Sequence, residues 1–231
     1  GLVFLSDSRT SAGLDQISTF RKMIIYERPD DRFMVLLSAG NLSISQSVRE
    51  ILQVEQVDRG PHEAALTIWN AQSMFDATRV LGAAVRRVYE QDAPSLRATG
   101  VDFNASFIFG GQIKGEAMRM FLVYSAGNFI EATPETCYFQ VGESKYGKPV
   151  LDRLIVPATP LDTAAKCALV SMDSTLKSNL GGARTLTVND LFQVLEIQGG
   201  NDTQASVDEL AARVGALESR LQPRGVSVSP A

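Results

Sequence analysis

The sequence predicts a mixed α and β domain of the α+β class, in which strand-like and helix-like segments come in blocks. Three observations favour this class. Runs of β-branched and aromatic residues fill the first forty positions, two segments with apolar residues three or four positions apart follow, and strand-like runs then return before a last helical segment. With 231 residues, 45% of them hydrophobic, the chain is long enough to bury one large core.

The first strands are expected at residues 2–6, 17–26 and 33–38, which are rich in β-branched and aromatic side chains. Gly13 separates the first two runs, and a turn at Pro29-Asp-Asp31 separates the second from the third. Short turns of this kind join antiparallel neighbours, so we expect hairpins.

Two helices are expected next, at residues 42–56 and 73–90. Asn41 can cap the first helix, and apolar residues recur in both at helical spacing. Strand-like runs resume at residues 103–109, 118–124, 129–132 and 138–141, and a further helix is predicted at residues 161–180.

The C-terminal part of the chain is expected to contain the last strand of the domain, followed by segments outside the domain. Residues 185–197 contain the last strand-like run, so the domain is predicted to span residues 1–198. Residues 199–205 are typical of a linker, residues 206–222 of an amphipathic helix, and residues 223–231 of a disordered tail. That helix would pack on its own domain or pair with a neighbouring subunit.

Composition excludes several functional classes. A net charge of −4 does not favour nucleic acid or an anionic membrane surface, and no apolar run approaches the ~18 residues of a membrane span. One histidine and two distant cysteines cannot form a standard zinc site, and no motif calls for a cofactor. Cys137 and Cys167 are expected to be reduced thiols in a cytoplasmic protein.

Six short motifs follow one another in a characteristic order. They are Asp7-Ser-Arg-Thr-Ser-Ala-Gly13, Ile17-Ser-Thr-Phe-Arg-Lys-Met23, Leu37-Ser-Ala-Gly-Asn-Leu42, Phe109-Gly-Gly-Gln112, Gly142-Glu-Ser-Lys-Tyr-Gly147 and Ser171-Met-Asp-Ser-Thr-Leu-Lys-Ser-Asn-Leu180. This series resembles the bacterial ancestral beta-subunit (Anbu) group of proteasome-type proteases, in the N-terminal-nucleophile hydrolase superfamily. The resemblance implies a four-layer α/β/β/α sandwich and identical subunits that stack into closed rings or open helical assemblies.

The resemblance also implies a threonine nucleophile at the mature N-terminus. The sequence begins at Gly1, within what would be the first hairpin of the family, so we expect the first strand and the nucleophile to lie upstream of Gly1. A threonine hydroxyl needs a base, which can be its own α-amino group, with a pKa of about 7.7–8.0. A buried cation beside the hydroxyl would favour its ionised form, and a carboxylate would hold that cation.

Lys22 is the expected cation and Asp7 its carboxylate. Asp7 ends the first predicted strand and Lys22 lies near the middle of the second, so a hairpin can bring them together. Ser178 stands where the family commonly has an aspartate that supports the N-terminal amine. Glu143 or Ser144 is expected to contact the same amine.

The turn after the third predicted strand is the expected oxyanion site. Gly40 would supply a backbone N–H, and Ser38 and Asn41 would contact substrate. Thr10 and Gly13 would present backbone to an extended peptide. The residues alone favour a simpler interpretation, in which Gly40 only makes a tight turn and Asn41 only caps a helix.

The sequence therefore predicts a threonine-type endopeptidase that cleaves peptide substrates through an acyl-enzyme. A catalytically inactive assembly subunit and an amidase of the same superfamily are the alternatives. A threonine at the mature N-terminus favours the peptidase, a cysteine or serine there favours the amidase, and any other residue favours the inactive subunit.

Overall fold

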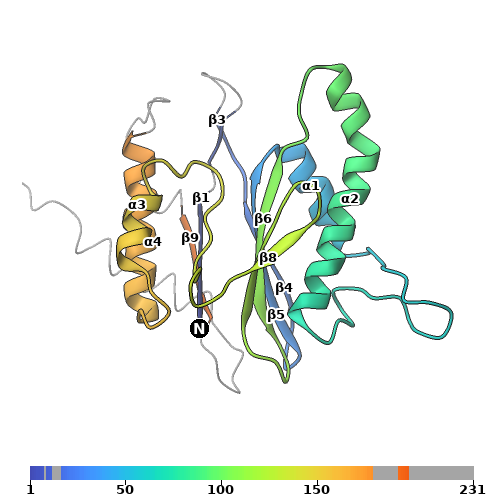
Figure 1. Cartoon of the computed structure of the whole chain (residues 1–231). Coiled ribbons are helices and arrows are strands. Elements are labelled where there is room, and N and C mark those ends of the chain that lie inside the picture. Colours follow the sequence, from blue (N-terminus) through green and yellow to red (C-terminus); the bar gives the residue numbers. More distant parts are fainter. Residues whose placement is uncertain (8, 12–16, 179–191, 198–231) are drawn as a thin grey trace, which may run out of the picture.

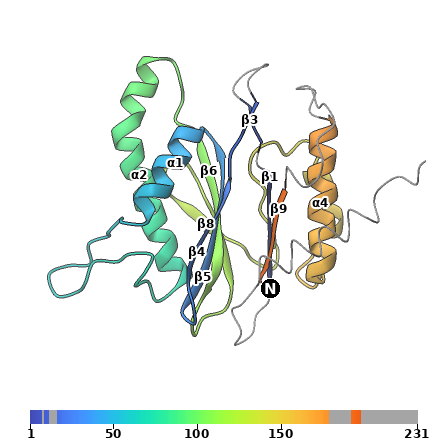
Figure 2. The same cartoon turned by 180° about the vertical axis from the view of Figure 1, so that it is seen from behind.

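The computed structural model describes residues 1–7, 9–11, 17–178 and 192–197 and confirms a mixed α and β class. Figure 1 shows the elements as successive layers. Helices α1 (Leu42–Leu52) and α2 (Met74–Ala98) cover one face of a five-stranded sheet. Strands β1 (Leu2–Asp7) and β9 (Phe192–Ile197) face its other side, and α3 (Lys148–Leu154) and α4 (Leu161–Ser178) lie beyond them, as the reverse view also shows (Figure 2).

The five-stranded sheet is antiparallel throughout and is ordered β4-β5-β6-β7-β8. Its strands are β4 (Met23–Arg28), β5 (Arg32–Gly40), β6 (Ala105–Ile113), β7 (Arg119–Val123) and β8 (Phe129–Glu131). Strand β6 runs four residues beyond its predicted end at Phe109. The strand continues through Gly110 and Gly111, where the neighbouring strands approach too closely for a side chain. An added Cβ would lie 2.8 Å from Arg119 O at Gly110 and 2.0 Å from Phe33 O at Gly111.

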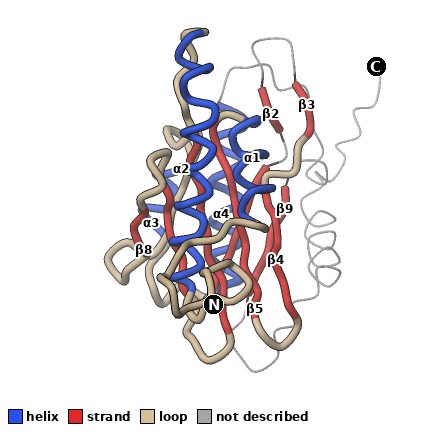
Figure 3. Tube along the Cα trace, turned by 90° about the vertical axis from the view of Figure 1, so that its right-hand side faces the viewer, coloured by secondary structure: helices blue, strands red, loops and turns tan. Residues whose placement is uncertain are grey.

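Two shorter antiparallel pairs complete the described strands. β1 pairs with β9 in the register Phe4↔Leu195. β2 (Arg9–Ser11) pairs with β3 (Ile17–Thr19), and this ribbon lies beyond the upper ends of β9 and β4 (Figure 3).

Each face of the large sheet packs against its own apolar cluster. On the helix side, Ile44, Val48 and Leu52 of α1 contact Met34 and Leu36 of β5 within a larger cluster that includes α2. On the opposite face, Phe4 of β1 packs with a cluster of buried residues from the large sheet: Met23, Phe33, Val35, Leu37, Ile108 and Met120. Burial of Phe4 fixes β1 over the sheet and so fixes the position of Asp7 at its end.

Several element boundaries differ from the predictions. The run predicted as one strand at residues 17–26 is β3 and β4, separated at residues 20–22, where the chain passes from the small ribbon into the large sheet. Helix α1 ends at Leu52 instead of residue 56. Helix α2 continues through Pro94 to Ala98, although an interior proline removes one helical hydrogen bond.

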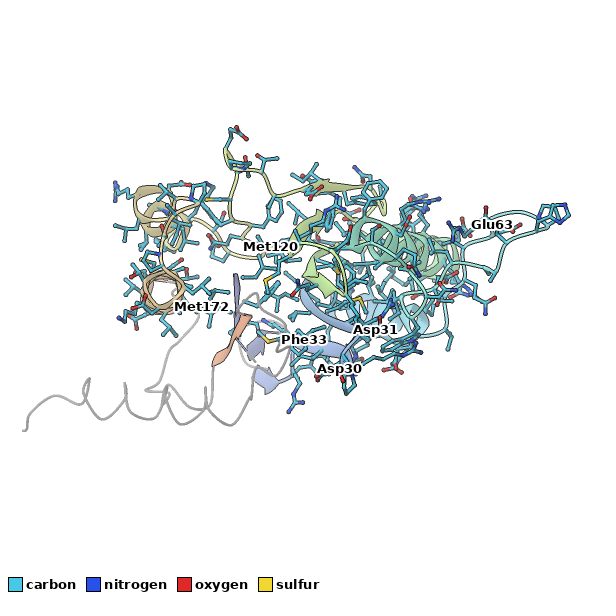
Figure 4. The ribbon with its side chains drawn as sticks, turned by 90° about the horizontal axis from the view of Figure 1, so that it is seen from below. Asp30, Asp31, Phe33, Glu63, Met120 and Met172 are labelled. Atoms are coloured by element: carbon cyan, nitrogen blue, oxygen red, sulfur yellow. The ribbon has the colours of Figure 1, made fainter. Side chains whose placement is uncertain are left out.

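The segment between β8 and α4 departs most from the prediction. Residues 138–141 do not form a strand, and the short helix α3 was not predicted. The predicted end of α4 at residue 180, most of the run at 185–197, and the linker, helix and tail after residue 198 lie outside the described residues. The excursion between α1 and α2 projects from the body, with Glu63 near its tip (Figure 4).

Candidate active site

Lys22 and Asp7 form an ion pair at one end of β1. The distance from Lys22 Nζ to Asp7 Oδ1 is 2.8 Å, and the side chains are 24% and 22% exposed. Lys22 is not in the middle of a strand, as predicted, but in the break that precedes β4. A lysine outside the regular strand pairing can turn towards β1, and water and salt screen this partly buried pair less than a surface pair.

The segment that carries Lys22 runs beside the end of β5. Ser38 N–H donates to Lys22 O at 3.2 Å, whereas Asn41 N–H donates to Asn104 O, in the chain just before β6, at 2.8 Å. Since N–H groups alternate in direction along an antiparallel strand and the N–H groups of Ser38 and Asn41 point to opposite sides, we infer that Gly40 N–H lies on the side of Ser38. That side is the one on which Phe20 and Lys22 lie.

Gly40 is required by the backbone at this turn. Its φ is +102°, and an added Cβ would lie 2.5 Å from Asn104 O. Asn41 follows as the N-cap of α1, and its side-chain oxygen accepts a hydrogen bond from Ser43 N–H at 2.9 Å. The predicted cap is therefore confirmed, and the positive end of the α1 dipole lies beside the Gly40 turn.

A cavity of about 550 Å³ extends along the whole of β1 and reaches the pair of Lys22 and Asp7. Its other walls come from the end of β5, from β7, from α4 and from the loop after β8. We call residues 132–147 of this loop the wall segment; within it, residues 132–134 and 137–143 line the cavity. Met172 of α4 and Met120 of β7 line opposite sides of it, and Figure 4 shows the two residues on either side of β1.

Two buried polar atoms in this cavity lack a hydrogen-bond partner within the part of the chain that the structure describes. They are Ser6 Oγ, whose residue is only 6% exposed, and Gln140 Oε1 of the wall segment. An unpaired buried polar atom is costly, so such atoms indicate a place where a further group binds. The sequence analysis missed both residues, although Ser6 shares the buried face of β1 with Phe4 and could have been noticed there.

The wall segment is fastened to α3 by a polar network. The Tyr138 hydroxyl donates to the Asp152 carboxylate, and Lys148 Nζ donates to Asp152 Oδ1 at 2.6 Å and to the Tyr138 oxygen at 3.1 Å. The Lys148 ammonium holds the pKa of Asp152 below its usual range, and burial raises the pKa of Tyr138. These contacts give the irregular wall a fixed attachment beside the cavity.

A second charged pair lines the cavity away from Lys22. Arg119 of β7 donates from Nε and Nη2 to the two carboxylate oxygens of Glu131, both at 2.7 Å. This bidentate contact holds the pKa of Glu131 below its ordinary value and raises that of Arg119.

The remaining predicted residues lie at several places around this region. Ser38 and Glu143 line the cavity. Glu143 Oε1 accepts a hydrogen bond from Lys145 N–H, and Ser144 O accepts one from Lys148 N–H at the start of α3. Thr10 lies on β2 and Ser178 is the last residue of α4, whereas Gly13 lies outside the described residues.

Within the described ranges, no group of three or more histidine, cysteine, aspartate or glutamate residues could hold a metal ion. None of the helices in the described part of the chain is long and apolar enough to cross a membrane.

Comparison with known proteins identifies the family. No protein-family model and no curated protein sequence matches the chain. Among solved structures, Anbu (ancestral beta-subunit) from Yersinia bercovieri is similar, with 39% sequence identity, a TM-score of 0.71, and coverage of 99% of this chain and 96% of that one. The chain belongs to the Anbu family.

Two further Anbu structures support this assignment. An Anbu (Gly-1) mutant from Hyphomicrobium sp. strain MC1 is 37% identical with a TM-score of 0.74, over 99% of this chain and 95% of that one. The helical assembly of the Anbu complex from Pseudomonas aeruginosa is 38% identical with a TM-score of 0.72, over 99% and 96%. The resemblance carried by the six motifs is thereby confirmed, and with it a proteasome-like fold of the N-terminal-nucleophile hydrolase type.

Proposed function

We propose that this Anbu-family chain is a threonine-type peptidase subunit whose nucleophile is an N-terminal threonine preceding Gly1. The observation that carries the proposal is the partly buried ion pair of Lys22 and Asp7 at the end of the cavity. A cation held by a carboxylate favours the ionised form of a hydroxyl nucleophile beside it, and so supports this role for the site.

In the proposed reaction, the α-amino group of the threonine takes the hydroxyl proton while the oxygen attacks the peptide carbonyl. The Lys22 ammonium stabilises the forming negative charge on the nucleophile, and Asp7 keeps Lys22 in position. Gly40 N–H, directed towards the Phe20–Lys22 segment, donates to the tetrahedral oxyanion. The amine product leaves with the proton from the α-amino group, and water then hydrolyses the acyl-enzyme by the reverse proton transfers.

The cavity supports the presence of a further strand at this place. Among the described strands β1 pairs with β9 alone, and the cavity follows β1 over its whole length. A strand that carries the threonine would fill the cavity, pair with β1 and give Ser6 and Gln140 hydrogen-bond partners. Such a strand would also complete the second sheet of a four-layer α/β/β/α sandwich.

The other proposed roles follow from this arrangement. Ser178 and either Glu143 or Ser144 would support the threonine amine, while Ser38, Asn41, Thr10 and Gly13 would contact an extended peptide. Since a 38% identical relative forms a helical assembly, we propose that identical copies of this cytoplasmic chain form an open helix or a ring. Residues 1–198 would form the folded domain of each copy.

Terminal-peptide and intact-mass spectrometry of the native mature protein tests the proposal. A free threonine roughly ten residues upstream of Gly1 is expected, since a β-strand of this length spans the cavity. Lys22→Ala should then lower peptide turnover by at least about 100-fold. Lys166→Ala, which removes an exposed lysine of α4, is the matched control and should leave turnover unchanged.

A different N-terminal residue in the mature protein would support one of the two alternative functions. Gly1 itself, or a blocked residue without a nucleophile, together with absent turnover, would leave an inactive assembly subunit. A free cysteine or serine would favour an amidase that acts on a small amide.

A further inference from the structure

The excursion between α1 and α2 is a long segment that the proposed mechanism does not use. It comprises residues 53–73, which we call the arm, and contains no helix and no extended strand. The arm projects from the helical layer, on the side of the molecule opposite α3 and α4 (Figure 1). Loops longer than about 12–15 residues without secondary structure are uncommon in compact domains, and ordered ones usually serve a function. The arm exceeds this length, so a function is expected of it.

The second leg of the arm, residues 66–73, is fixed to the large sheet by two arginines. Arg32, which is only 4% exposed, donates from Nη1 to two carbonyl oxygens of this leg at 2.6 and 3.2 Å. Arg28 Nη1 donates to Trp69 O at 3.0 Å, and the Arg28 guanidinium carbon lies 4.8 Å from the centroid of the Trp69 ring. The Trp69 Nε1–H group donates to Gln53 O at 3.3 Å and so joins the second leg to the beginning of the arm.

The first leg, residues 53–57, is also fixed to the body. Glu55 is only 7% exposed, and its Oε2 accepts a hydrogen bond from Arg87 Nη1 of α2 at 3.3 Å. Val57 and Leu66 then pair as an isolated antiparallel bridge, with N···O distances of 2.9 and 2.8 Å. Because both legs are fixed up to this bridge, residues 58–64 are held away from the body as a tip of defined position.

The tip is charged and exposed. Arg59 Nε lies 3.0 Å from Glu63 Oε2, and the two side chains are 40% and 58% exposed. Among the described residues, the hydrogen bonds of the tip also stay within it, from Gly60 N–H to Asp58 Oδ1 and from Glu63 N–H to Gly60 O. Figure 4 shows Glu63 far from the sheets. Since water screens an exposed ion pair, the pair of Arg59 and Glu63 contributes little to the stability of its own subunit.

We propose that the tips of two identical copies bind each other across a two-fold axis, where Arg59 of each copy pairs with Glu63 of the other. The inference rests on the proposed function only for the association of identical copies, and it adds the surface at which two copies meet. A two-fold contact brings the same patch of both subunits together, so a patch with both members of an ion pair is complementary to itself. Four charges of alternating sign would replace two exposed pairs, and water and salt would screen them less.

The charges of the tip favour a second copy over a partner of another kind. Asp58 and Glu63 are acidic and Arg59 is basic, so the tip presents both signs of charge close together. A strongly acidic or strongly basic partner would be matched by charges of one sign instead.

Charge reversal at the tip tests this contact in the native full-length protein. Arg59→Glu and Glu63→Arg each place like charges opposite each other when two identical copies meet. Each variant should therefore raise the dissociation constant for association of the copies by at least about tenfold, as measured by analytical ultracentrifugation. An equimolar mixture of the two variants should recover wild-type association, because both contacts between unlike copies again join opposite charges. The pair within each subunit stays broken in both variants, so recovery on mixing reports a contact between copies.

Lys166→Glu is the matched control, because Lys166 belongs to another exposed pair four residues apart, with Asp162 of α4, and it should leave association unchanged. Circular dichroism of all variants should match the wild type, since each substituted side chain is exposed. Unchanged association in Arg59→Glu and Glu63→Arg, or a monomeric wild type, would overturn the inference. A loss in both variants that mixing does not reverse would also overturn it, since the tip would then contact a different surface.

Peptide turnover by the same samples separates this inference from the proposed function. Recovery of association on mixing, without turnover in any sample including the wild type, overturns the peptidase and leaves the contact between tips. Turnover by the wild type, with association that charge reversal does not change, overturns the contact and leaves the peptidase.

Discussion

Single residues in this protein act through short polar contacts and through backbone geometry. The bidentate contact of Arg119 with Glu131 and the turn at Gly40 are examples of the two kinds. Neither depends on long-range packing alone, so each is open to a test by one substitution.

Glu131→Gln should lower the free energy of unfolding at pH 7 by less than about 1 kcal/mol, since the Glu131 side chain is 38% exposed and screened by water. The contact lowers the folded-state pKa of Glu131 from its usual value, so its contribution is complete above that value and is lost as pH falls through the folded pKa. Urea unfolding should show a larger difference between variant and wild type at pH 7 than at pH 3. An equal difference at both values would contradict the electrostatic cause.

Gly40→Ala should destabilise the protein more than Gly60→Ala does. Both glycines have φ of +102°, so both substitutions incur about 1–2 kcal/mol for the left-handed backbone. Only at Gly40 would the new Cβ meet a neighbour, Asn104 O at 2.5 Å, whereas nothing lies within 4 Å at Gly60. Thermal unfolding of the two variants measures the excess, and equal shifts would mean that the turn adjusts freely.

At the scale of elements, the position of α3 depends on one close contact. An added Cβ on Gly147 would lie 2.6 Å from Ser171 Oγ and 2.7 Å from Thr175 Oγ1 of α4. Glycine therefore lets the start of α3 approach α4, and it thereby sets where the network of Tyr138, Lys148 and Asp152 holds the wall segment.

Gly147→Ala should lower the free energy of unfolding by about 1–3 kcal/mol, as expected for overpacking. Ser171→Ala in the same chain removes the nearest oxygen and should restore part of the loss, which a double-mutant cycle in urea would show. Purely additive effects would indicate that α3 simply moves away.

The sequence predicted elements well where local signals decide them. The Asn41 cap, the start of α1 and the strands of the large sheet follow from capping residues and periodicity. The break at residues 20–22, the absence of a strand at 138–141, and α3 depend on which distant elements they pack against. The sequence predicted that Lys22 and Asp7 lie close together, although β1 pairs with β9 and not with a strand that carries Lys22. The cavity, with Ser6 and Gln140, arises only when separate layers enclose it.

At the scale of the whole molecule, the cavity lies where the two halves of the described structure meet. Phe4 contacts the large sheet on one side of β1, and α4 lies on its other side. A segment that fills this cavity would therefore stabilise the packing of the layers as well as take part in the proposed reaction.

Ser6→Ala should lower the free energy of unfolding of the native protein by about 1 kcal/mol, because the segment proposed to occupy the cavity would pair with the Ser6 hydroxyl. Calorimetric unfolding of the assembled protein measures this change. A gain in stability would mean that the hydroxyl stays unpaired and that no polar group reaches it.

The wall segment shapes the cavity without taking part in strand pairing, so the shape of the cavity and the stability of the fold depend on different residues. Residues 132–147 belong to none of the three described sheets, yet they contribute much of one side of the cavity and are anchored at Tyr138. Substitutions there change the shape and polarity of the cavity without disturbing a strand register. Divergence among relatives of this chain should therefore accumulate at the wall-segment residues that line the cavity. Saturation libraries confined to those residues, with Tyr138 and Gly147 left unchanged, should yield altered ligand preference at unchanged thermal stability.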